Sequence, residues 1–204
     1  LYRDDEIDLP AVSPLPEGSL DMQTVWLNQS RQSDVYKISA DVARNARHAY
    51  YGMISYIDDK VGGILATLAR TGLDSNTLVI FLGDHGEMMG ERGMWFKSTF
   101  FEWSARVPLI LSFPDRFIAQ RRSEIVSLVD LLPTLLDLAA PGAKSKTVDA
   151  LDGRSLVAML EGKVETHWPD TAISEYTADG VCAPCRMIRR GAFKYVYIHG
   201  HSAL

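Results

Sequence analysis

The chain has 204 residues, of which 47% are hydrophobic and 23% are charged, which is the composition of ordinary folded protein. Its formal net charge of −5 argues against non-specific binding of nucleic acid, and no apolar run approaches the roughly 20 residues of a membrane helix. No signal peptide is visible, but this carries little weight because we expect the true N-terminus to lie outside this chain. Our expectation is a folded, cytoplasmic protein that binds neither nucleic acid nor membrane.

The first third of the chain predicts a connector followed by a long helix. Residues 1–20 are rich in proline and acidic residues and indicate irregular structure. Residues 33–70 show helical periodicity, and Gly72 is a suitable residue to end that helix. The apolar residues fall on one stripe of the helix: Tyr50, Ile54, Ile57, Val61, Ile64, Leu65 and Leu68.

The rest of the chain alternates between strands and helices. Residues 77–82 are apolar and β-branched enough to predict a buried parallel strand, and residues 106–113 predict another. Helices are expected at residues 128–140, ended by Pro141 and Gly142, and at 153–160. Short strands are expected at residues 172–176, 187–190 and 193–198, with a hairpin turn at 190–192.

These elements predict an α/β fold with helices around a mostly parallel sheet, plus a small antiparallel β element at the C-terminal end. We divide the chain into an irregular connector (residues 1–32), an α/β domain portion (33–165) and a C-terminal β-hairpin region (166–204).

The strand at residues 77–82 is followed directly by Gly83, Asp84, His85 and Gly86, with Lys97 further on. In α/β proteins, ligands bind beyond the carboxyl ends of the strands. A carboxylate and an imidazole side by side offer an oxygen and a nitrogen to a cation, and a lysine supplies a positive charge for an oxyanion. The alternative is that this turn is only a polar loop, and the motif by itself does not decide between them.

A wider context resembles the sulfatase family of the alkaline-phosphatase superfamily. The similar block includes residues 56–65, the Gly-Asp-His-Gly-Glu run at 83–87, Gly90–Lys97 and the Phe-Glu-Trp-Ser-Ala-Arg-Val-Pro run at 101–108. The sequence of this block is most similar to that of the choline sulfatases. The resemblance extends from about residue 40 to residue 114 and, more weakly, over 174–197.

The resemblance implies an alkaline-phosphatase-like sandwich fold and a set of roles. Asp84 and His85 would be metal ligands, with Ca²⁺ favoured over Mg²⁺ or Mn²⁺, and Lys97 would bind the sulfate oxygens as a catalytic and substrate-binding residue. The family also has an Asp pair for the metal and a nucleophile, a formylglycine made from a Cys-x-Pro-Ser-Arg segment, and no Asp pair followed by such a segment precedes Tyr50. We therefore expect the C-terminal portion of a longer enzyme, inactive alone, that associates with the missing half or forms a homo-oligomer.

The resemblance also implies a substrate, choline sulfate, which would be hydrolysed to choline and sulfate. Glu175, in the Ser-Glu-Tyr segment, is our candidate for the counter-charge of a quaternary ammonium, and an ordinary exposed glutamate is the alternative. Two other functions stay open: a phosphate or phosphonate monoester hydrolase of the same superfamily, and a non-catalytic fragment that only assembles with a partner. Glu91 and Arg92 are expected to brace the loop.

Two further groups could attract a metal or a nucleophile assignment. Cys182, Pro184 and Arg186 fit a loose Cys-x-Pro-x-Arg pattern, but they follow the Asp-His loop, whereas the family's nucleophile precedes it. Cys182 and Cys185 also form half of a zinc motif without a second half, so we expect ordinary thiols. His199 and His201 close the chain and are expected to be solvated.

Overall fold

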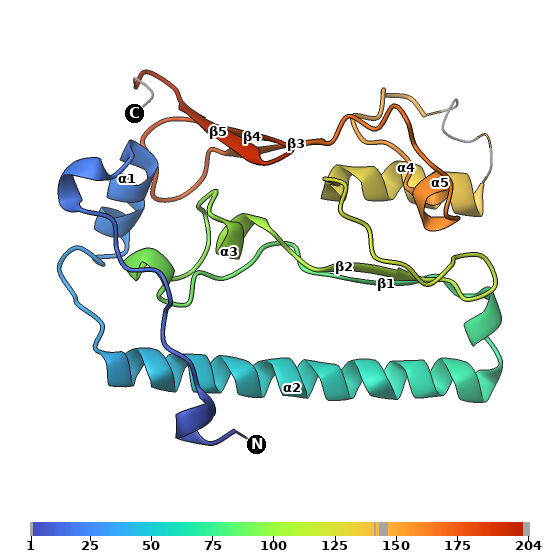
Figure 1. Cartoon of the computed structure of the whole chain (residues 1–204), viewed down its shortest axis with the longest axis horizontal. Coiled ribbons are helices and arrows are strands. Elements are labelled where there is room, and N and C mark those ends of the chain that lie inside the picture. The colour runs from blue at the N-terminus through green and yellow to red at the C-terminus, as the bar shows by residue number, and fades with distance from the viewer. Residues whose placement is uncertain (1, 141, 143–146, 202–204) are drawn as a thin grey trace.

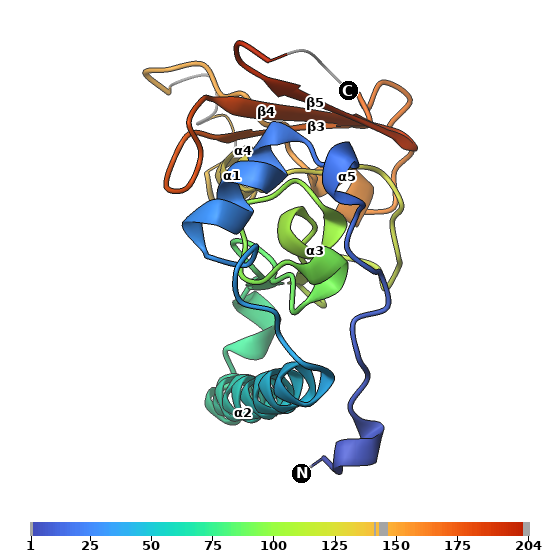
Figure 2. The same ribbon diagram turned by 90° about the vertical axis from the view of Figure 1, so that its left-hand side faces the viewer.

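The computed structural model describes residues 2–140, 142 and 147–201, and its elements lie in tiers (Figures 1 and 2). The long helix α2 (Ala40–Thr71) forms one side. A hairpin of β1 (Val79–Leu82) and β2 (Leu109–Ser112), extended by the short helix α3 (Glu102–Ala105), lies in the middle. The opposite side is formed by β3 (Thr171–Tyr176), β4 (Cys185–Arg190) and β5 (Phe193–Ile198), with α1 (Met22–Ser30) at one end and α4 (Leu131–Ala139) and α5 (Val157–Leu160) at the other.

The predicted long helix is confirmed, with clear signals at both ends. Ser39 caps α2 by accepting a hydrogen bond from the Val42 N–H (3.3 Å), so the helix begins there and not at residue 33. Gly72 ends it in the left-handed conformation, with φ 69°. The apolar stripe of this helix is largely exposed in this chain: Ile57 is 50% exposed and Ile64 is 63% exposed.

The predicted parallel sheet is not seen in the described residues. β1 pairs with β2 in the antiparallel sense, with Val79 opposite Ser112 and Leu82 opposite Leu109. A parallel pair needs a crossover that carries the chain back along the sheet. The segment after β1 holds instead a 3₁₀ turn at Glu91–Gly93 and the one-turn helix α3, and it brings β2 back alongside β1 in the opposite direction. A short apolar run has the same pattern in both pairings, so the sequence could not separate them.

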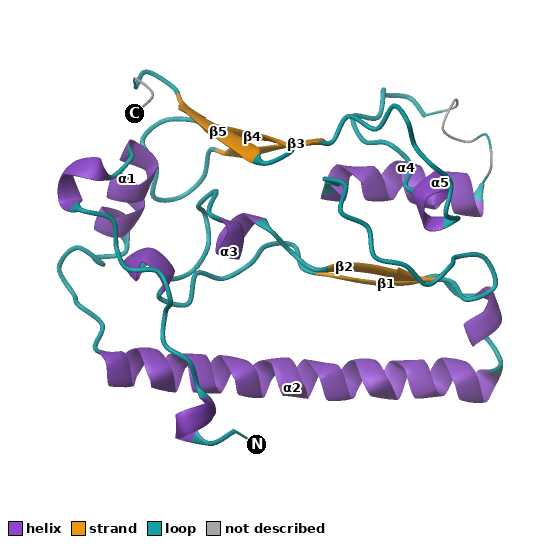
Figure 3. Cartoon of the chain, in the orientation of Figure 1, coloured by secondary structure: helices purple, strands orange, loops and turns teal. Residues whose placement is uncertain are grey.

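The small antiparallel element at the C-terminal end is confirmed. β3, β4 and β5 form one antiparallel sheet in that order, and Glu175 lies opposite Arg186 in its register. Gly191 makes the turn between β4 and β5 with φ 53°. Figure 3 shows that these strands are short and that helices and loops make up most of the chain.

Three helices differ in detail from the prediction. α1 lies inside the segment predicted to be irregular, and Asp21 caps it by accepting from the Thr24 N–H (2.9 Å). The expected helix at 128–140 starts as a 3₁₀ turn at Leu128–Asp130 and continues as α4; its predicted stop at Pro141 lies outside the described residues. α5 is shorter than expected. The proposed domain boundaries stay predictions. Among the described helices, none is both long and apolar enough to span a bilayer.

The buried core is small and lies around the loop that follows β1. One cluster joins Phe100 to residues of the C-terminal sheet: Cys185, Met187 and Ile198. A second cluster joins α1 to the loop through Leu27, Met88 and Met94, which are at most 1% exposed. The best-packed part of this chain is therefore the part that carries the loop.

A buried carboxylate ties three segments together beside this core. Glu91, 4% exposed, accepts hydrogen bonds from the backbone N–H groups of Ala11 (3.1 Å) and Val12 (2.9 Å). Arg47 of α2 lies 3.5 Å from the same carboxylate and donates to the Met89 carbonyl (3.0 Å). Glu91 therefore braces the loop as predicted, since it holds the N-terminal segment and α2 against it.

Replacing the Glu91 carboxylate tests how much it contributes to the stability of the fold. Glu91→Gln keeps the shape but removes the charge and turns one acceptor into a donor that faces an N–H group. We expect the free energy of unfolding to fall by about 3 kcal/mol, as for other broken buried ion pairs, measured by urea denaturation. The matched change Glu165→Gln, at an exposed side chain, should change it by less than about 0.5 kcal/mol. Equal effects of the two variants would contradict this role.

A second carboxylate joins α3 to the C-terminal sheet. Glu102 accepts hydrogen bonds from Arg189 Nη1 (2.7 Å) and from Lys194 Nζ, and Lys194 also donates to the Phe100 carbonyl (2.6 Å). Partial burial acts to raise the pKa of Glu102, but the bonds and charges of Lys194 and Arg189 outweigh it and hold the pKa below its ordinary value.

This lowered pKa predicts a pH dependence of stability. The unfolded glutamate titrates near pH 4.3, so the contribution of Glu102 is complete above about that pH and is lost as the pH falls through the lower, folded value. The difference in unfolding free energy between the unchanged protein and Glu102→Gln should therefore be largest near neutral pH and shrink on acidification. Urea midpoints measured from about pH 7 to 3 check this. A difference that is constant with pH would show that the carboxylate charge is irrelevant.

Candidate active site

The Asp-His loop is held against α3 by a close backbone approach at Gly86. The Gly86 N–H donates to the Ser104 carbonyl (2.8 Å), and a Cβ at Gly86 would lie 1.9 Å from the Trp103 carbonyl oxygen. Only glycine fits there. Gly86 therefore allows the backbone of the loop to lie directly against the backbone of α3.

Asp84 and His85 present their donor atoms close together. Asp84 Oδ1 accepts from the His85 N–H (3.0 Å), and His85 Nδ1 lies 2.9 Å from the Gly86 carbonyl oxygen. With Nδ1 donating to that carbonyl, Nε2 keeps its lone pair, and it lies 3.6 Å from Asp84 Oδ2. A carboxylate oxygen and an imidazole nitrogen this close suit a single divalent cation with bonds of roughly 2.0–2.6 Å.

These two side chains can supply only part of a coordination shell. Within the described residues, no group of three or more His, Cys, Asp or Glu side chains could hold a metal ion. Ca²⁺ takes about six to eight oxygen-rich ligands and Mg²⁺ takes six. The residues present therefore fit a metal centre completed by other polypeptide, solvent or substrate.

Lys97 lies beside His85. Its Nζ is 2.5 Å from His85 Nε2, to which it can donate because an ammonium group has only donors. A single lone pair cannot serve both a lysine proton and a metal ion. A cation on Nε2 would therefore release the Lys97 ammonium group toward another acceptor, and an anionic substrate oxygen has the required charge.

The predicted site residues share one cavity. Asp84, His85, Lys97 and Glu175 line a cavity of about 720 Å³ bounded by the loop, the end of α1 and β3. The Glu175 side chain is 57% exposed, and Arg186 Nε lies 2.6 Å from its carboxylate across the β3–β4 pair. The structure brings the four residues together, and their roles stay predictions.

Arg31 also lines this cavity, and no feature of the sequence predicted it. Arg31 lies at the end of α1, inside the segment predicted to be irregular, and its guanidinium donates to the carbonyl oxygens of Trp95 (3.0 Å) and Lys97 (2.7 Å). No motif marks it, because its partners are backbone atoms more than sixty positions away in the chain. An arginine at a helix end is common on protein surfaces, so only the fold shows its contacts.

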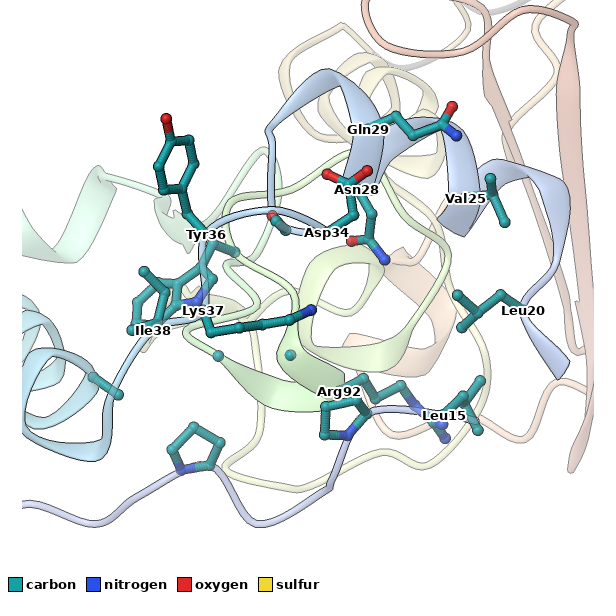
Figure 4. Close-up of a pocket in the computed structure, with 17 residues that line it drawn as sticks. Leu15, Leu20, Val25, Asn28, Gln29, Asp34, Tyr36, Lys37, Ile38 and Arg92 are labelled. Carbon is teal, nitrogen blue, oxygen red and sulfur yellow. The ribbon is translucent and has the colours of Figure 1, made fainter. Parts of the chain in front are cut away.

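A second cavity, of about 530 Å³, shares the loop but none of the four predicted site residues (Figure 4). Its lining includes Lys37, Asn28 and Arg92. Arg92 has a positive φ of 56°, and its guanidinium lies 4.6 Å from the centre of the Phe101 ring. This stacking agrees with a bracing role for Arg92.

The remaining cysteines and histidines lie apart from the cavity of the predicted site. Cys182 is exposed, whereas Cys185 is fully buried at the start of β4, and burial raises the pKa of its thiol. The Tyr197 hydroxyl is 3.3 Å from His199 Nδ1, and the ring of His201 packs edge-on against Trp26 at 5.0 Å. Both His199 and His201 are exposed, as expected, and each also lies against an aromatic ring.

Comparison with known proteins shows which family the chain is similar to. Family models for "Sulfatase" and for "N-sulphoglucosamine sulphohydrolase, C-terminal" match residues 20–141 and 90–202. The choline-sulfatase of Rhizobium meliloti (strain 1021) is 39% identical over 198 residues, which are 97% of this chain and 38% of that protein. Arylsulfatase K of Canis lupus familiaris is 32% identical over 208 residues, 98% of this chain and 37% of that protein.

Solved structures show the same relationship. The crystal structure of the phosphonate monoester hydrolase of Agrobacterium radiobacter matches with a TM-score of 0.69 and 32% identity, covering 79% of this chain and 34% of that one. The chain therefore belongs to the sulfatase family of the alkaline-phosphatase superfamily. It resembles choline sulfatase and the arylsulfatases in sequence, and it spans less than two-fifths of the length of these curated relatives.

If Asp84 and His85 bind a metal ion, removing either side chain should lower the metal content. In the complete enzyme, Asp84→Ala or His85→Ala should lower the divalent-metal content of the purified protein by more than about half, because each removes one of few protein ligands. Both side chains are solvent-accessible, so unfolding midpoints measured without metal should hardly change. Metal content by elemental analysis is the measurement. Unchanged content in both variants would mean that the loop is only a polar turn.

Proposed function

We propose that this chain is the C-terminal portion of a sulfuric ester hydrolase that cleaves choline sulfate to choline and sulfate. The observation that carries the proposal is the meeting of Asp84, His85, Lys97 and Glu175 in one cavity. The 39% identity to a choline-sulfatase supports the choice of substrate.

Each of these side chains has a chemical task in the proposed reaction. A sulfate monoester carries its negative charge on oxygens, and the ammonium group of Lys97 would bind one of them and offset the charge that grows in the transition state. Asp84 and His85 would hold part of a divalent cation site, for which Ca²⁺ is favoured, and that cation would supply Lewis-acid polarisation. The nucleophile, a formylglycine, is expected in the rest of the enzyme.

Exposed apolar surface supports the view that more polypeptide covers this chain. The stripe of α2 includes Ile54, Ile57 and Ile64, each about half exposed or more, and Phe81 and Ile110 of the β1–β2 hairpin are 39% and 59% exposed. Contiguous apolar surface of this kind is typical of interfaces. We propose that the remainder of the sulfatase fold packs on α2 and the hairpin.

Glu175 would give the site its preference for choline. A trimethylammonium group cannot donate N–H hydrogen bonds, so a carboxylate attracts it by charge alone. In the structure Arg186 already pairs with Glu175, at 2.6 Å. The proposed substrate therefore competes with Arg186 for the carboxylate.

A phosphonate or phosphate monoester hydrolase is the second candidate. The observation that favours it is the 32% identity and shared fold with the phosphonate monoester hydrolase of Agrobacterium radiobacter. Lys97 and a cation on Asp84 and His85 would neutralise either anion, since both ester types carry their negative charge on oxygens bound to a tetrahedral sulfur or phosphorus atom. Turnover of the two ester types by the complete enzyme separates the candidates, and absence of any turnover would favour a non-catalytic assembly role.

Substitution at Glu175 tests the choline assignment. In the complete enzyme, Glu175→Gln should lower kcat/KM for choline sulfate about ten-fold, because attraction between a partly desolvated cation and its partner is worth roughly 1–2 kcal/mol. Hydrolysis of an uncharged aryl sulfate should change less than about two-fold. The partner variant Arg186→Gln provides the matched control: it frees the carboxylate, so kcat/KM for choline sulfate should stay equal or rise.

Three outcomes would count against the assignment. Equal losses on both esters in Glu175→Gln would give Glu175 a general structural role. No loss on either ester would mean that Glu175 is an ordinary exposed glutamate without a role in the site. A loss of choline sulfate hydrolysis in Arg186→Gln would make Arg186 the group that meets the substrate.

A further inference from the structure

The backbone on both sides of Lys97 has a conformation that its residues do not favour. Phe96 has φ 66° and Ser98 has φ 79°, in the left-handed region that favours glycine. A strained backbone of this kind persists only where the surroundings hold it, and it is often found at functional sites. The question is therefore which contacts hold residues 95–98.

The backbone of residues 95–98 is held by hydrogen bonds to its carbonyl groups. Arg31 donates from Nη1 to the Trp95 oxygen (3.0 Å) and from Nη2 to the Lys97 oxygen (2.7 Å). The Met88 N–H donates to the Phe96 oxygen (2.8 Å), and Gln23 Nε2 donates to the Ser98 oxygen (2.9 Å). Every carbonyl from Trp95 to Ser98 thus has a donor, and three of these bonds come from α1 or the residue that ends it.

Arg31 is suited to this bridge by its shape. Its planar guanidinium presents donors in a fixed fork, so one side chain can hold two carbonyls that flank a single residue. The Phe96 ring lies 5.7 Å from its Cζ, and the same guanidinium lines the cavity with Asp84, His85 and Lys97. A lysine at this position would offer a point charge without the fork.

We propose that Arg31 is a positioning residue that sets the place of Lys97 by bridging the Trp95 and Lys97 carbonyls. The inference rests on the proposed function in one respect, that Lys97 contacts the anion of the ester. By holding the strained backbone, Arg31 keeps the Lys97 side chain at the cavity, where its ammonium group can meet the substrate oxygens. Arg31 itself acts through Lys97.

The first test compares variants of the complete enzyme on the ester that it hydrolyses best. Arg31→Met should lower kcat/KM about ten- to a hundred-fold, and Arg31→Lys should recover only part of this loss. Arg121→Met, an arginine change at an exposed position, serves as the matched control and should stay within about two-fold. Full activity in Arg31→Met, or full recovery in Arg31→Lys, would overturn the proposal.

The second test is a double-mutant cycle with Lys97→Met. If Arg31 acts through Lys97, Arg31→Met should cost about ten-fold or more in the unchanged enzyme and less than about two-fold in the Lys97→Met background. Equal losses in both backgrounds would show that Arg31 acts on the substrate or on folding independently, and would overturn the proposal. A merely structural arginine cannot produce this dependence on Lys97.

A third measurement separates this inference from the proposed function. If Lys97→Met alone leaves turnover of every ester unchanged, the proposed role of Lys97 in binding the ester anion fails. Hydrogen exchange at the Met88 amide still reports on the loop, because that amide donates to Phe96 and is buried. Exchange faster by about ten-fold in Arg31→Met, with Arg121→Met unchanged, would support the bridge, and unchanged exchange would overturn it.

Discussion

The buried carboxylate of Glu91 is the interaction on which the candidate site most depends. It accepts two backbone hydrogen bonds from the N-terminal segment and lies against Arg47 of α2, so three separate stretches of chain meet at one charge. A buried carboxylate without these partners would be strongly unfavourable, so the partners and the charge require one another. Glu91 belongs to the loop between β1 and α3, so its contacts hold that loop against the N-terminal segment and α2. The same loop carries Asp84, His85 and Lys97.

The loop also depends on α1, which lies in a segment that resembled a connector. Leu27 of α1 is fully buried against Met88 and Met94, which fixes the helix on the loop by apolar contact. Arg31 and Gln23 then reach the loop carbonyls with directional bonds. Packing thus determines where α1 lies, and hydrogen bonds determine the backbone shape around Lys97.

The two sheets differ in how far the sequence could predict them. The C-terminal strands alternate around a glycine turn, so local pattern was sufficient for β4 and β5. The pairing of β1 with β2 depends on the path of the segment between them, which has no periodic signal. The apolar stripe of α2 was correctly predicted as one face of a helix, and most of its residues are exposed in this chain.

The sequence by itself determined the family and the long helix, and it supplied Asp84, His85 and Lys97 as candidate site residues, because each depends on neighbours in the chain or on a motif with fixed spacing. Only the tertiary structure decided that Glu175 shares their cavity, that Arg186 pairs with it, and that Arg31 holds the backbone at Lys97. These contacts join positions far apart in the chain. Their geometry follows from packing and from backbone hydrogen bonds, which leave no pattern in residue order.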